Sequence, residues 1–348
     1  MTMDVKSCLF GILADGTEVH LYSISNGKIS FSATDYGCVI TSIIIPSKTG
    51  RNEDIVLGPS SFDGVVCSSS YFGAMVGRFA NRIGGAKFSL NDKEYHLDSN
   101  DNGNCLHGGL FRWDKILWNS EVVETREGSG IRFSRHSPDG EQGMPGNLDV
   151  AVTYLLTMNN EIIIKYEGFC DKDTPINFTN HSYFNLKGQF DTIDTHVLSM
   201  NCSSFLEVDD SLVPTGRILS VEDTVFDFRT PKEMGKDFSS MDLEKTGGYD
   251  HCYCIDSAGG ELVDFATVVE PTSGRTMTVA TDLPGVQFYT GNSLGGGMGK
   301  NGNIYVGHSG FCLETQYYPD TPNKTEFPSC ILKAGEKYSS TTIYAFKW

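Results

Sequence analysis

Alternating hydrophobic and polar positions dominate the sequence and begin close to its N-terminus. Residues 20–25 alternate in this way, Asn26-Gly27 follows, and residues 28–32 alternate again. Asn-Gly between two alternating runs is the strongest short-range signal for a β-hairpin, because a type I′ turn needs positive φ at both central residues. This segment is therefore predicted to form a hairpin.

Two further hairpins follow the same pattern. Each has two alternating runs around an Asn-containing turn: residues 87–90 and 93–97 around Asn91-Asp92, and residues 152–156 and 162–166 around Asn159-Asn160. Later strands are expected over residues 276–280, 286–290, 311–316 and 339–346. Helical periodicity is scarce, and only short helices are expected, over residues 61–67 and 241–245.

Many short strands separated by Gly- and Asn-rich turns are typical of an all-β sandwich or barrel. A chain of 348 residues is long enough for two domains at about 150 residues each. However, no internal repeat, low-complexity tract or Pro-rich linker divides it. We therefore expect residues 1–348 to form a single large β domain with few short helices.

Charge and composition exclude several classes of partner. The net charge of −17 argues against nucleic-acid binding, which needs clustered Lys and Arg. No stretch approaches the roughly 18 apolar residues that span a bilayer, and the N-terminus does not resemble a signal peptide. The ten cysteines are scattered, so reduced thiols in a cytoplasmic protein are expected. A monomer is the simplest expectation for the quaternary state.

Four polar clusters stand in otherwise apolar or Gly-flanked sequence and are candidates for chemistry. They are residues 77–84 with Asn81 and Arg82, residues 106–109 with His107, residues 177–186 around His181, and residues 311–316 with Glu314. None of the eight histidines has a metal-ligand spacing such as His-x-x-x-His, and no metal site is predicted.

Each cluster also has a structural interpretation. A single Glu in an apolar strand usually faces solvent, which applies to Glu314. His181 fits a hydrogen-bonded core histidine, Arg82 a surface salt bridge, and His107 the cap of a turn. Residue types alone leave these alternatives open.

Taken together, the clusters resemble the aldose 1-epimerase (galactose mutarotase) family over essentially the whole chain. The segments that carry the resemblance are Gly-Arg-Phe-Ala-Asn-Arg-Ile at 77–83, Leu-His-Gly-Gly at 106–109, Asn-His-Ser-Tyr-Phe-Asn-Leu at 180–186, Gly-Tyr-Asp-His at 248–251, Gly-Val-Gln-Phe-Tyr-Thr at 285–290 and Glu-Thr-Gln at 314–316. A stretch from residue 318 to 328 also fits.

The resemblance implies the large antiparallel β-sandwich (supersandwich) of this family, with a sugar site in a cleft on one sheet. It implies interconversion of the α and β anomers of free hexoses such as galactose and glucose, without a cofactor. Glu314 would be the general base and His181 the general acid. The residues implied to bind the sugar are Asn81, Arg82, His107, Tyr183, Asp250 and Gln287.

Acid–base residues suit this reaction, because opening a pyranose removes the C1 hydroxyl proton and delivers a proton to the ring oxygen. The sequence leaves open whether a carboxylate or apolar surroundings control the pKa of His181, since the two act in opposite directions.

Three other functions compete with this one. A hexose-6-phosphate epimerase would need more cationic groups in the cleft than these motifs supply. A sugar-binding sandwich without catalysis would not need both Glu314 and His181. A glycoside hydrolase would need two carboxyl groups about 5–9.5 Å apart, for which only Glu314 and Asp250 are available.

Overall fold

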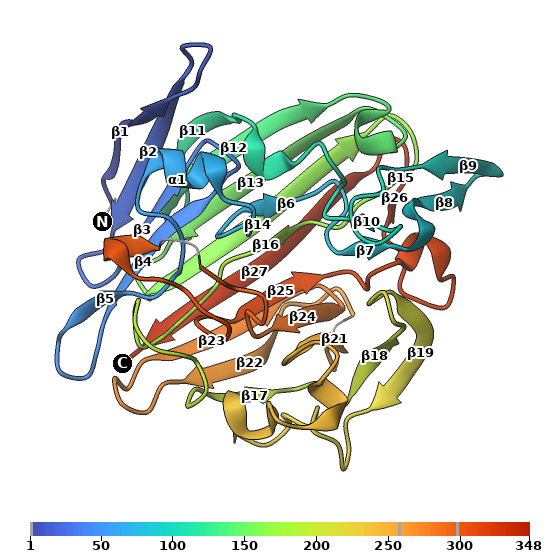
Figure 1. Ribbon diagram of the computed structural model, residues 1–348. Helices are drawn as coiled ribbons and strands as arrows, with labels where there is room; N and C mark the ends of the chain where they lie inside the picture. Colours follow the sequence, from blue (N-terminus) through green and yellow to red (C-terminus); the bar gives the residue numbers. More distant parts are fainter. Residues whose placement is uncertain (1–2, 257–258, 297–298) are drawn as a thin grey trace.

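The computed structural model describes residues 3–256, 259–296 and 299–348 and consists mainly of antiparallel sheets (Figure 1). The largest sheet has nine strands, in the spatial order β11 (Asn119–Glu124), β12 (Ser129–Ser137), β13 (Leu148–Leu156), β14 (Glu161–Cys170), β27 (Lys337–Lys347), β23 (Thr276–Thr281), β22 (Val263–Val269), β17 (Val197–Met200) and β20 (Lys232–Glu233). The C-terminal strand β27 lies between β14 and β23, so it joins strands that are far apart in sequence.

Two five-stranded sheets accompany it. One is formed by β1 (Val5–Ile12), β2 (Glu18–Ser25), β3 (Ser30–Thr34), β4 (Ile40–Pro46) and β5 (Asn52–Asp54), in that order. The other has the order β19 (Pro214–Ser220), β18 (Ser204–Val208), β21 (Asp250–Cys254), β24 (Gly285–Tyr289) and β25 (Cys312–Gln316). The largest hydrophobic cluster includes Phe31 of β3, Tyr344 of β27 and Leu313 of β25, so the three sheets share one core.

Short elements complete the fold. The two-stranded pairs are β6 (Met75–Val76) with β16 (Thr179–Asn180), β7 (Arg82–Ile83) with β10 (Cys105–Leu106), β8 (Lys87–Leu90) with β9 (Lys93–His96), and β15 (Thr174–Pro175) with β26 (Ile331–Leu332). The helices are α1 (Phe62–Cys67) and the 3₁₀ turns η1 (Gly84–Ala86), η2 (Trp113–Lys115), η3 (Glu141–Gly143), η4 (Met234–Asp237), η5 (Met241–Leu243), η6 (Lys300–Gly302) and η7 (Thr321–Asn323). Among the described residues, no helix has the length and apolar character to cross a membrane.

The expected all-β fold is confirmed, and its hairpins are present. Asn91 and Asp92 both have positive φ, at 52° and 60°, as a type I′ turn requires. The turn at Asn26 differs from the prediction, because it is a four-residue loop between β2 and β3 in which Gly27 has positive φ and Asn26 does not. The Asn26 side-chain oxygen accepts hydrogen bonds from the backbone N–H groups of Lys28 and Ile29, which stabilises the longer loop.

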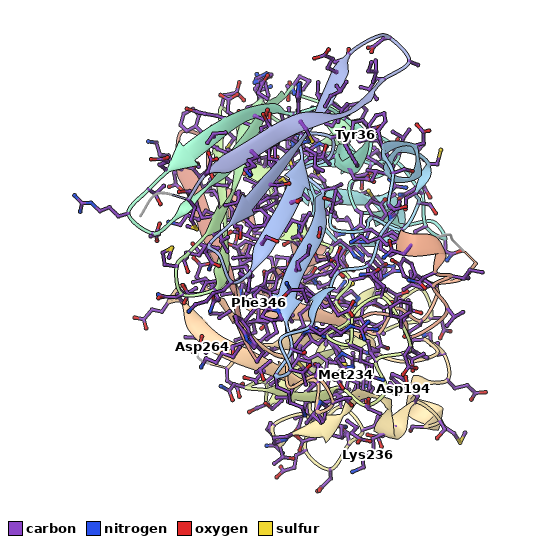
Figure 2. The ribbon with its side chains drawn as sticks, turned by 90° about the vertical axis from the view of Figure 1, so that its left-hand side faces the viewer. Tyr36, Asp194, Met234, Lys236, Asp264 and Phe346 are labelled. Carbon is purple, nitrogen blue, oxygen red and sulfur yellow. The ribbon has the colours of Figure 1, made fainter. Side chains whose placement is uncertain are left out.

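The two ends of the molecule are built differently. Figure 2 shows Tyr36 near the end where the first five-stranded sheet lies, and Asp194, Met234 and Lys236 at the opposite end. There the backbone N–H of Gly235 donates to the Asp194 carbonyl, which fastens η4 beside the edge of the large sheet. Three of the functional candidates, Asp250, Gln287 and Glu314, lie on the second five-stranded sheet, and the others line the same cavity from other segments.

Candidate active site

All eight candidate residues line one cavity of about 330 Å³. Its walls are formed by Ser69, Ser70, Tyr71, Asn81, Arg82, Leu106, His107, His181, Tyr183, Asp250, Gln287, Tyr289, Ser293, Leu294 and Glu314. The structure therefore brings together residues that are spread over more than 230 positions of the chain, from Asn81 to Glu314.

The floor of the cavity comes from three neighbouring strands, β21, β24 and β25. Gln287 and Glu314 are direct cross-strand partners. The Gln287 Nε2 atom donates to Asp250 Oδ1 over 2.6 Å. Side chains at cross-strand positions lie close together, so this sheet sets a carboxyl group, an amide and a second carboxyl group side by side.

Strand alternation explains why Glu314 reaches the cavity. Successive side chains of β25 point to opposite faces; Leu313 enters the hydrophobic core, while Cys312 and Glu314 share the other face. Glu314 is only 3% exposed. The alternative in which this Glu faces solvent is therefore wrong.

The opposite wall comes from the paired strands β7 and β10 and the loop after β10. Arg82 Nε lies 2.7 Å from Asp101 Oδ2, so the expected salt bridge is present, but the pair is largely buried rather than on the surface, and Arg82 lines the cavity. His107 follows β10 with φ of 53°, and its Nδ1 accepts a hydrogen bond from the Asn81 backbone N–H at 3.1 Å. His107 thus holds a turn and faces the cavity. Because Nδ1 is an acceptor, the proton of the neutral ring lies on Nε2, which makes Nε2 a donor.

His181 lies among aromatic rings. The Tyr183 ring is nearly parallel to it at 4.9 Å, and the Tyr71 ring at 5.9 Å. His181 Nε2 is 3.6 Å from Glu314 Oε1, and both side chains are buried. His181 is therefore a buried histidine, as the structural interpretation expected, but one that faces a carboxyl group across the cavity.

Burial controls the protonation of these groups. It lowers the pKa of His181 to about 4, and it raises the pKa of Glu314 well above its ordinary value, to which the nearby Asp250 carboxyl also contributes. Burial also raises the pKa of Asp250 and lowers that of His107 well below its usual range. Desolvation disfavours every charged form, so it decides the question that the sequence left open for His181.

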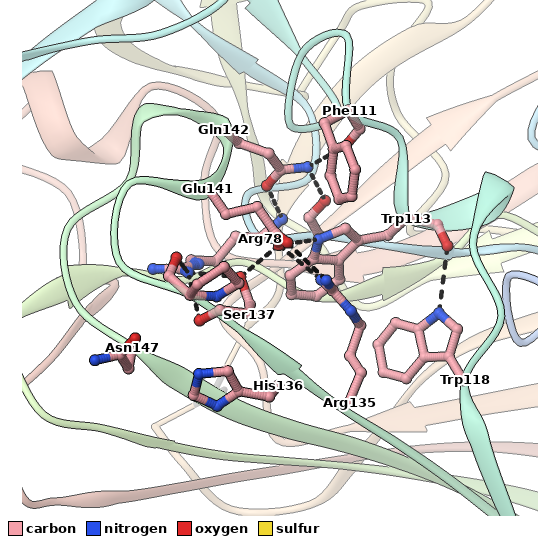
Figure 3. Close-up of polar contacts among 12 residues, drawn as sticks. Arg78, Phe111, Trp113, Trp118, Arg135, His136, Ser137, Glu141, Gln142 and Asn147 are labelled. Carbon is pink, nitrogen blue, oxygen red and sulfur yellow. Dashed lines mark hydrogen bonds and ion pairs between the residues drawn. The ribbon is translucent and has the colours of Figure 1, made fainter.

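A buried polar network around Arg78 and Gln142, drawn in Figure 3, lies next to the segments that carry Asn81, Arg82 and His107. The fully buried Arg78 donates to Ser137 Oγ at 2.6 Å and to four backbone carbonyls, those of residues 137, 138, 145 and 146. Gln142 accepts from the Arg78 backbone N–H at 2.8 Å and donates to the Phe111 carbonyl at 2.7 Å. These bonds fasten the segment before Asn81 to the segment after His107.

Gly108 shows how closely these segments approach. Its φ is 84°, and a Cβ atom there would lie 2.3 Å from Gln142 Nε2 and 2.6 Å from the Gly77 carbonyl oxygen. Only glycine combines this left-handed conformation with so close a contact. The glycine beside His107 is thus part of the wall of the cavity.

Comparisons with known proteins agree with this geometry. The model of the aldose 1-epimerase family matches residues 20–345. Galactose mutarotase from Rattus norvegicus is 42% identical over 347 residues, which are 99% of this chain and 99% of that protein. Aldose 1-epimerase from Haemophilus influenzae is 40% identical, covering 96% of this chain and 97% of that protein. The crystal structure of an aldose epimerase homologue from C. elegans superposes with a TM-score of 0.85 at 31% identity, covering 93% of this chain and 98% of that one.

The chain belongs to the aldose 1-epimerase family. The family and the fold that the sequence predicted are therefore confirmed, and the chain is an isomerase of the epimerase class. Identities of 40–42% over nearly the full length support mutarotase activity on hexoses.

In this epimerase the side chains of His107, His181 and Glu314 lie close enough together to be considered as ligands of a metal ion. Atoms of His107, His181 and Glu314 lie within 4.8 Å of one another, although their sequence spacing contains no metal motif. Two imidazoles and a carboxylate are a known zinc ligand set. His107 does not fit that role, because its hydrogen bond from Asn81 keeps the proton on Nε2, the nitrogen left for a metal. The cluster is better suited to hydroxyl groups.

Sequence reasoning missed several residues of the cavity. Tyr289 is two positions after Gln287 on the same strand, so strand alternation could have identified it. Tyr71 contacts the rings of both His107 and His181, but it follows no motif and precedes β6 in a loop. No local pattern in the sequence points to Tyr71.

Proposed function

We propose that this cavity opens and recloses the pyranose ring of free hexoses such as galactose and glucose, which interconverts their α and β anomers. Glu314 acts as the general base on the C1 hydroxyl and His181 as the general acid at the ring oxygen. The remaining residues of the cavity bind the sugar hydroxyls: Asn81, Arg82, His107, Tyr183, Asp250 and Gln287.

Unpartnered acceptors in the floor of the cavity support this proposal most directly. Glu314 Oε2 and Gln287 Oε1 are buried and have no hydrogen-bond partner in the part of the chain that the structure describes. A buried polar group without a partner costs about 1–3 kcal/mol, so a ligand that donates hydrogen bonds to both is favoured. His107 Nε2 contributes a donor from the opposite wall. A neutral polyol supplies donors and acceptors at once and fits both walls.

The chemistry balances without a redox partner. Glu314 takes the proton of the C1 hydroxyl, the C1–O5 bond breaks as the C1 carbonyl forms, and His181 gives its proton to O5. Rotation about C1–C2 exposes the other face of the aldehyde, and the same two transfers in reverse close the ring. No atom changes oxidation state between the two anomers. Each positioned acid or base contributes about 10² to 10⁴ in rate.

Glu314 and His181 share one proton in this mechanism. Burial favours the protonated form of Glu314 and the neutral form of His181 before a sugar binds. Sugar hydroxyls that donate to the Glu314 carboxylate stabilise its charged form and lower its pKa. Substrate binding thus favours transfer of the shared proton to His181, which prepares the base and the acid together.

The charges around the cavity favour a free sugar over a phosphorylated one. Arg82 is the only Lys or Arg among the described residues that line it, and it is already paired with Asp101. Asp250 and Glu314 place two carboxyl groups on the floor. A phosphate dianion would meet one engaged cation and two acidic groups.

Polarimetry of freshly dissolved α-D-galactose at neutral pH tests the proposal. The wild-type protein should accelerate the approach to equilibrium. In Glu314→Gln the catalysed rate should be lower by a factor of at least about 10², because an amide has no basic site. Glu121→Gln, the same change at an exposed strand position, is the matched control and should keep full activity. Binding of galactose without acceleration by the wild type would instead indicate a sugar-binding protein.

We also propose that the whole chain folds as one domain and acts as a monomer in the cytoplasm. The main hydrophobic cluster includes residues from Met3 to Phe346, as expected for one domain. All ten cysteines are free, which is typical of a reducing compartment. Light scattering coupled to size-exclusion chromatography should give the mass of one chain, and a dimer mass would contradict the monomer.

A further inference from the structure

The two ring nitrogens of His181 have different neighbours. Nε2 lies on the side of Glu314, 3.6 Å from Oε1. Nδ1 lies 3.5 Å from the sulfur of Cys312, within hydrogen-bond distance for sulfur. Cys312 and Glu314 are two positions apart on β25, so one face of this strand supplies both neighbours.

Cys312 is a neutral partner for the ring. The side chain is fully buried, and burial raises the pKa of its thiol well above the ordinary value, so the sulfur remains uncharged. A neutral thiol is both a weak donor and a weak acceptor. It therefore satisfies Nδ1 without supplying the negative charge that a carboxylate would place there.

We propose that Cys312 is a positioning residue whose sulfur accepts the Nδ1 proton of His181 and so leaves Nε2 as the nitrogen that gains and releases the catalytic proton. The role rests on the acid–base function proposed above. A ring protonated only on Nε2 would become an imidazolate when it gave that proton away. With Nδ1–H held by sulfur, His181 alternates between imidazolium and neutral imidazole, as an acid–base catalyst requires.

The other side chains around His181 leave this task to Cys312. The aromatic neighbours Tyr71, Tyr183 and His107 contact the ring by stacking or by an edge. Apart from burial, a hydrogen bond with its own backbone raises the pKa of His181, and the charged groups Asp114 and Arg112 act on it through space. Among the described residues, Cys312 has the only side chain within hydrogen-bond distance of Nδ1.

The tautomer of His181 can be measured directly in the ligand-free, full-length protein. Long-range ¹H–¹⁵N NMR spectra of ¹⁵N-histidine-labelled protein distinguish Nδ1–H from Nε2–H rings, and His181→Asn assigns the signal. We expect the Nδ1–H form in the wild type at neutral pH. An Nε2–H ring in the wild type overturns the proposal without the use of any variant.

Substitutions at Cys312 test the consequence for turnover. Cys312→Val and Cys312→Ala remove the acceptor and should shift His181 toward the Nε2–H tautomer, with kcat lowered about tenfold and KM little changed. Cys312→Ser keeps an acceptor and should retain the wild-type tautomer and a kcat within about threefold of the wild type. Cys252→Val, at a buried thiol of the neighbouring strand β21, is the matched control and should change neither.

The outcomes separate the two proposals. Wild-type tautomer and turnover in Cys312→Val and Cys312→Ala would overturn the role of Cys312, and so would a loss in Cys312→Ser equal to that in Cys312→Val. A wild-type protein that shows the Nδ1–H tautomer but does not accelerate anomer exchange would contradict the proposed function and leave the hydrogen bond established.

Discussion

His181 Nε2 and Glu314 Oε1 lie 3.6 Å apart in a cavity where burial shifts the pKa values of the two side chains in opposite directions. The lower of the two is that of His181, at about 4, and the higher is that of Glu314. At any pH between these two pKa values, the pair therefore carries one proton. Two groups coupled in this way titrate as a unit.

The activity should follow this shared proton. We expect kcat/KM to fall toward acid with a limb near pH 4 as the pair takes up a second proton, and to fall toward alkali, above the raised pKa of Glu314, as Glu314 loses the shared one. Polarimetry from pH 4 to 9, corrected for the spontaneous rate and accompanied by circular dichroism at each pH, measures this. An acid limb near pH 6.5 would show that His181 titrates as a solvated histidine.

Arg82 should contribute mainly to binding. Its side chain is fixed by Asp101 at 2.7 Å and faces the cavity without a hydrogen bond to His181 or Glu314. Arg82→Ala should raise KM about tenfold or more with kcat within a few-fold, because it removes ground-state hydrogen bonds to the sugar. Asp101→Asn keeps the guanidinium and should raise KM less. A selective loss of kcat in Arg82→Ala would show that Arg82 stabilises the transition state rather than the bound sugar.

The buried Arg78 should be a strong determinant of stability. Its guanidinium donates to Ser137 and to the backbone carbonyls of residues 145 and 146, and Arg78→Leu leaves these acceptors unsatisfied. At about 1–3 kcal/mol for each such group, we expect a loss of about 3 kcal/mol or more in the free energy of unfolding, measured by urea denaturation. Arg126→Leu, at an exposed position, is the control and should change stability by less than about 0.5 kcal/mol.

Four buried histidines should make the fold sensitive to acid. Burial lowers the pKa of His181 and His251 to about 4 and that of His196 to about 3, and it lowers the pKa of His107 well below its usual range. In the unfolded chain a histidine titrates near pH 6.5, so between pH 6.5 and about 4 the unfolded state binds more protons than the folded state. The stability that these neutral rings provide is present above pH 6.5 and is lost as the pH falls.

Each histidine should contribute a slope of about 1.4 kcal/mol per pH unit within that window. Urea denaturation at several pH values between 7 and 4 measures the total slope. His251→Gln should reduce this slope by about 1.4 kcal/mol per pH unit, because it removes one buried histidine. A slope that is the same in His251→Gln and in the wild type would contradict the role of burial at His251.

The sequence predicts the local elements of this fold well, because turns and alternation are local signals. Asn91-Asp92 forms the expected turn with both residues at positive φ. Asn26-Gly27 does not, since the Asn26 side chain accepts two local N–H groups and also donates to the carbonyl of Thr157, 131 positions away. The long-range contact was not accessible from the pattern of this hairpin.

The same distinction applies to the site. The motifs of the resemblance contain the eight residues that meet in the cavity. Tyr71 and Cys312 meet His181 through contacts that depend on how separate loops and strands pack, and the Cys312 contact joins residues 131 positions apart. Strand alternation places Cys312 on the same face of β25 as Glu314, but it does not indicate that His181 is the side chain that contacts Cys312.

The two walls of the cavity come from different parts of the chain. Asn81, His107 and His181 precede the turn whose exposed residues are 209 and 210, whereas Asp250 and Glu314 follow it. A chain cut at this turn would give two fragments, each with half of the acid–base pair and neither able to turn over sugar alone. Recovery of anomer exchange on mixing would then report reassembly of the whole β-sandwich, so the enzyme offers a split reporter whose signal is optical rotation.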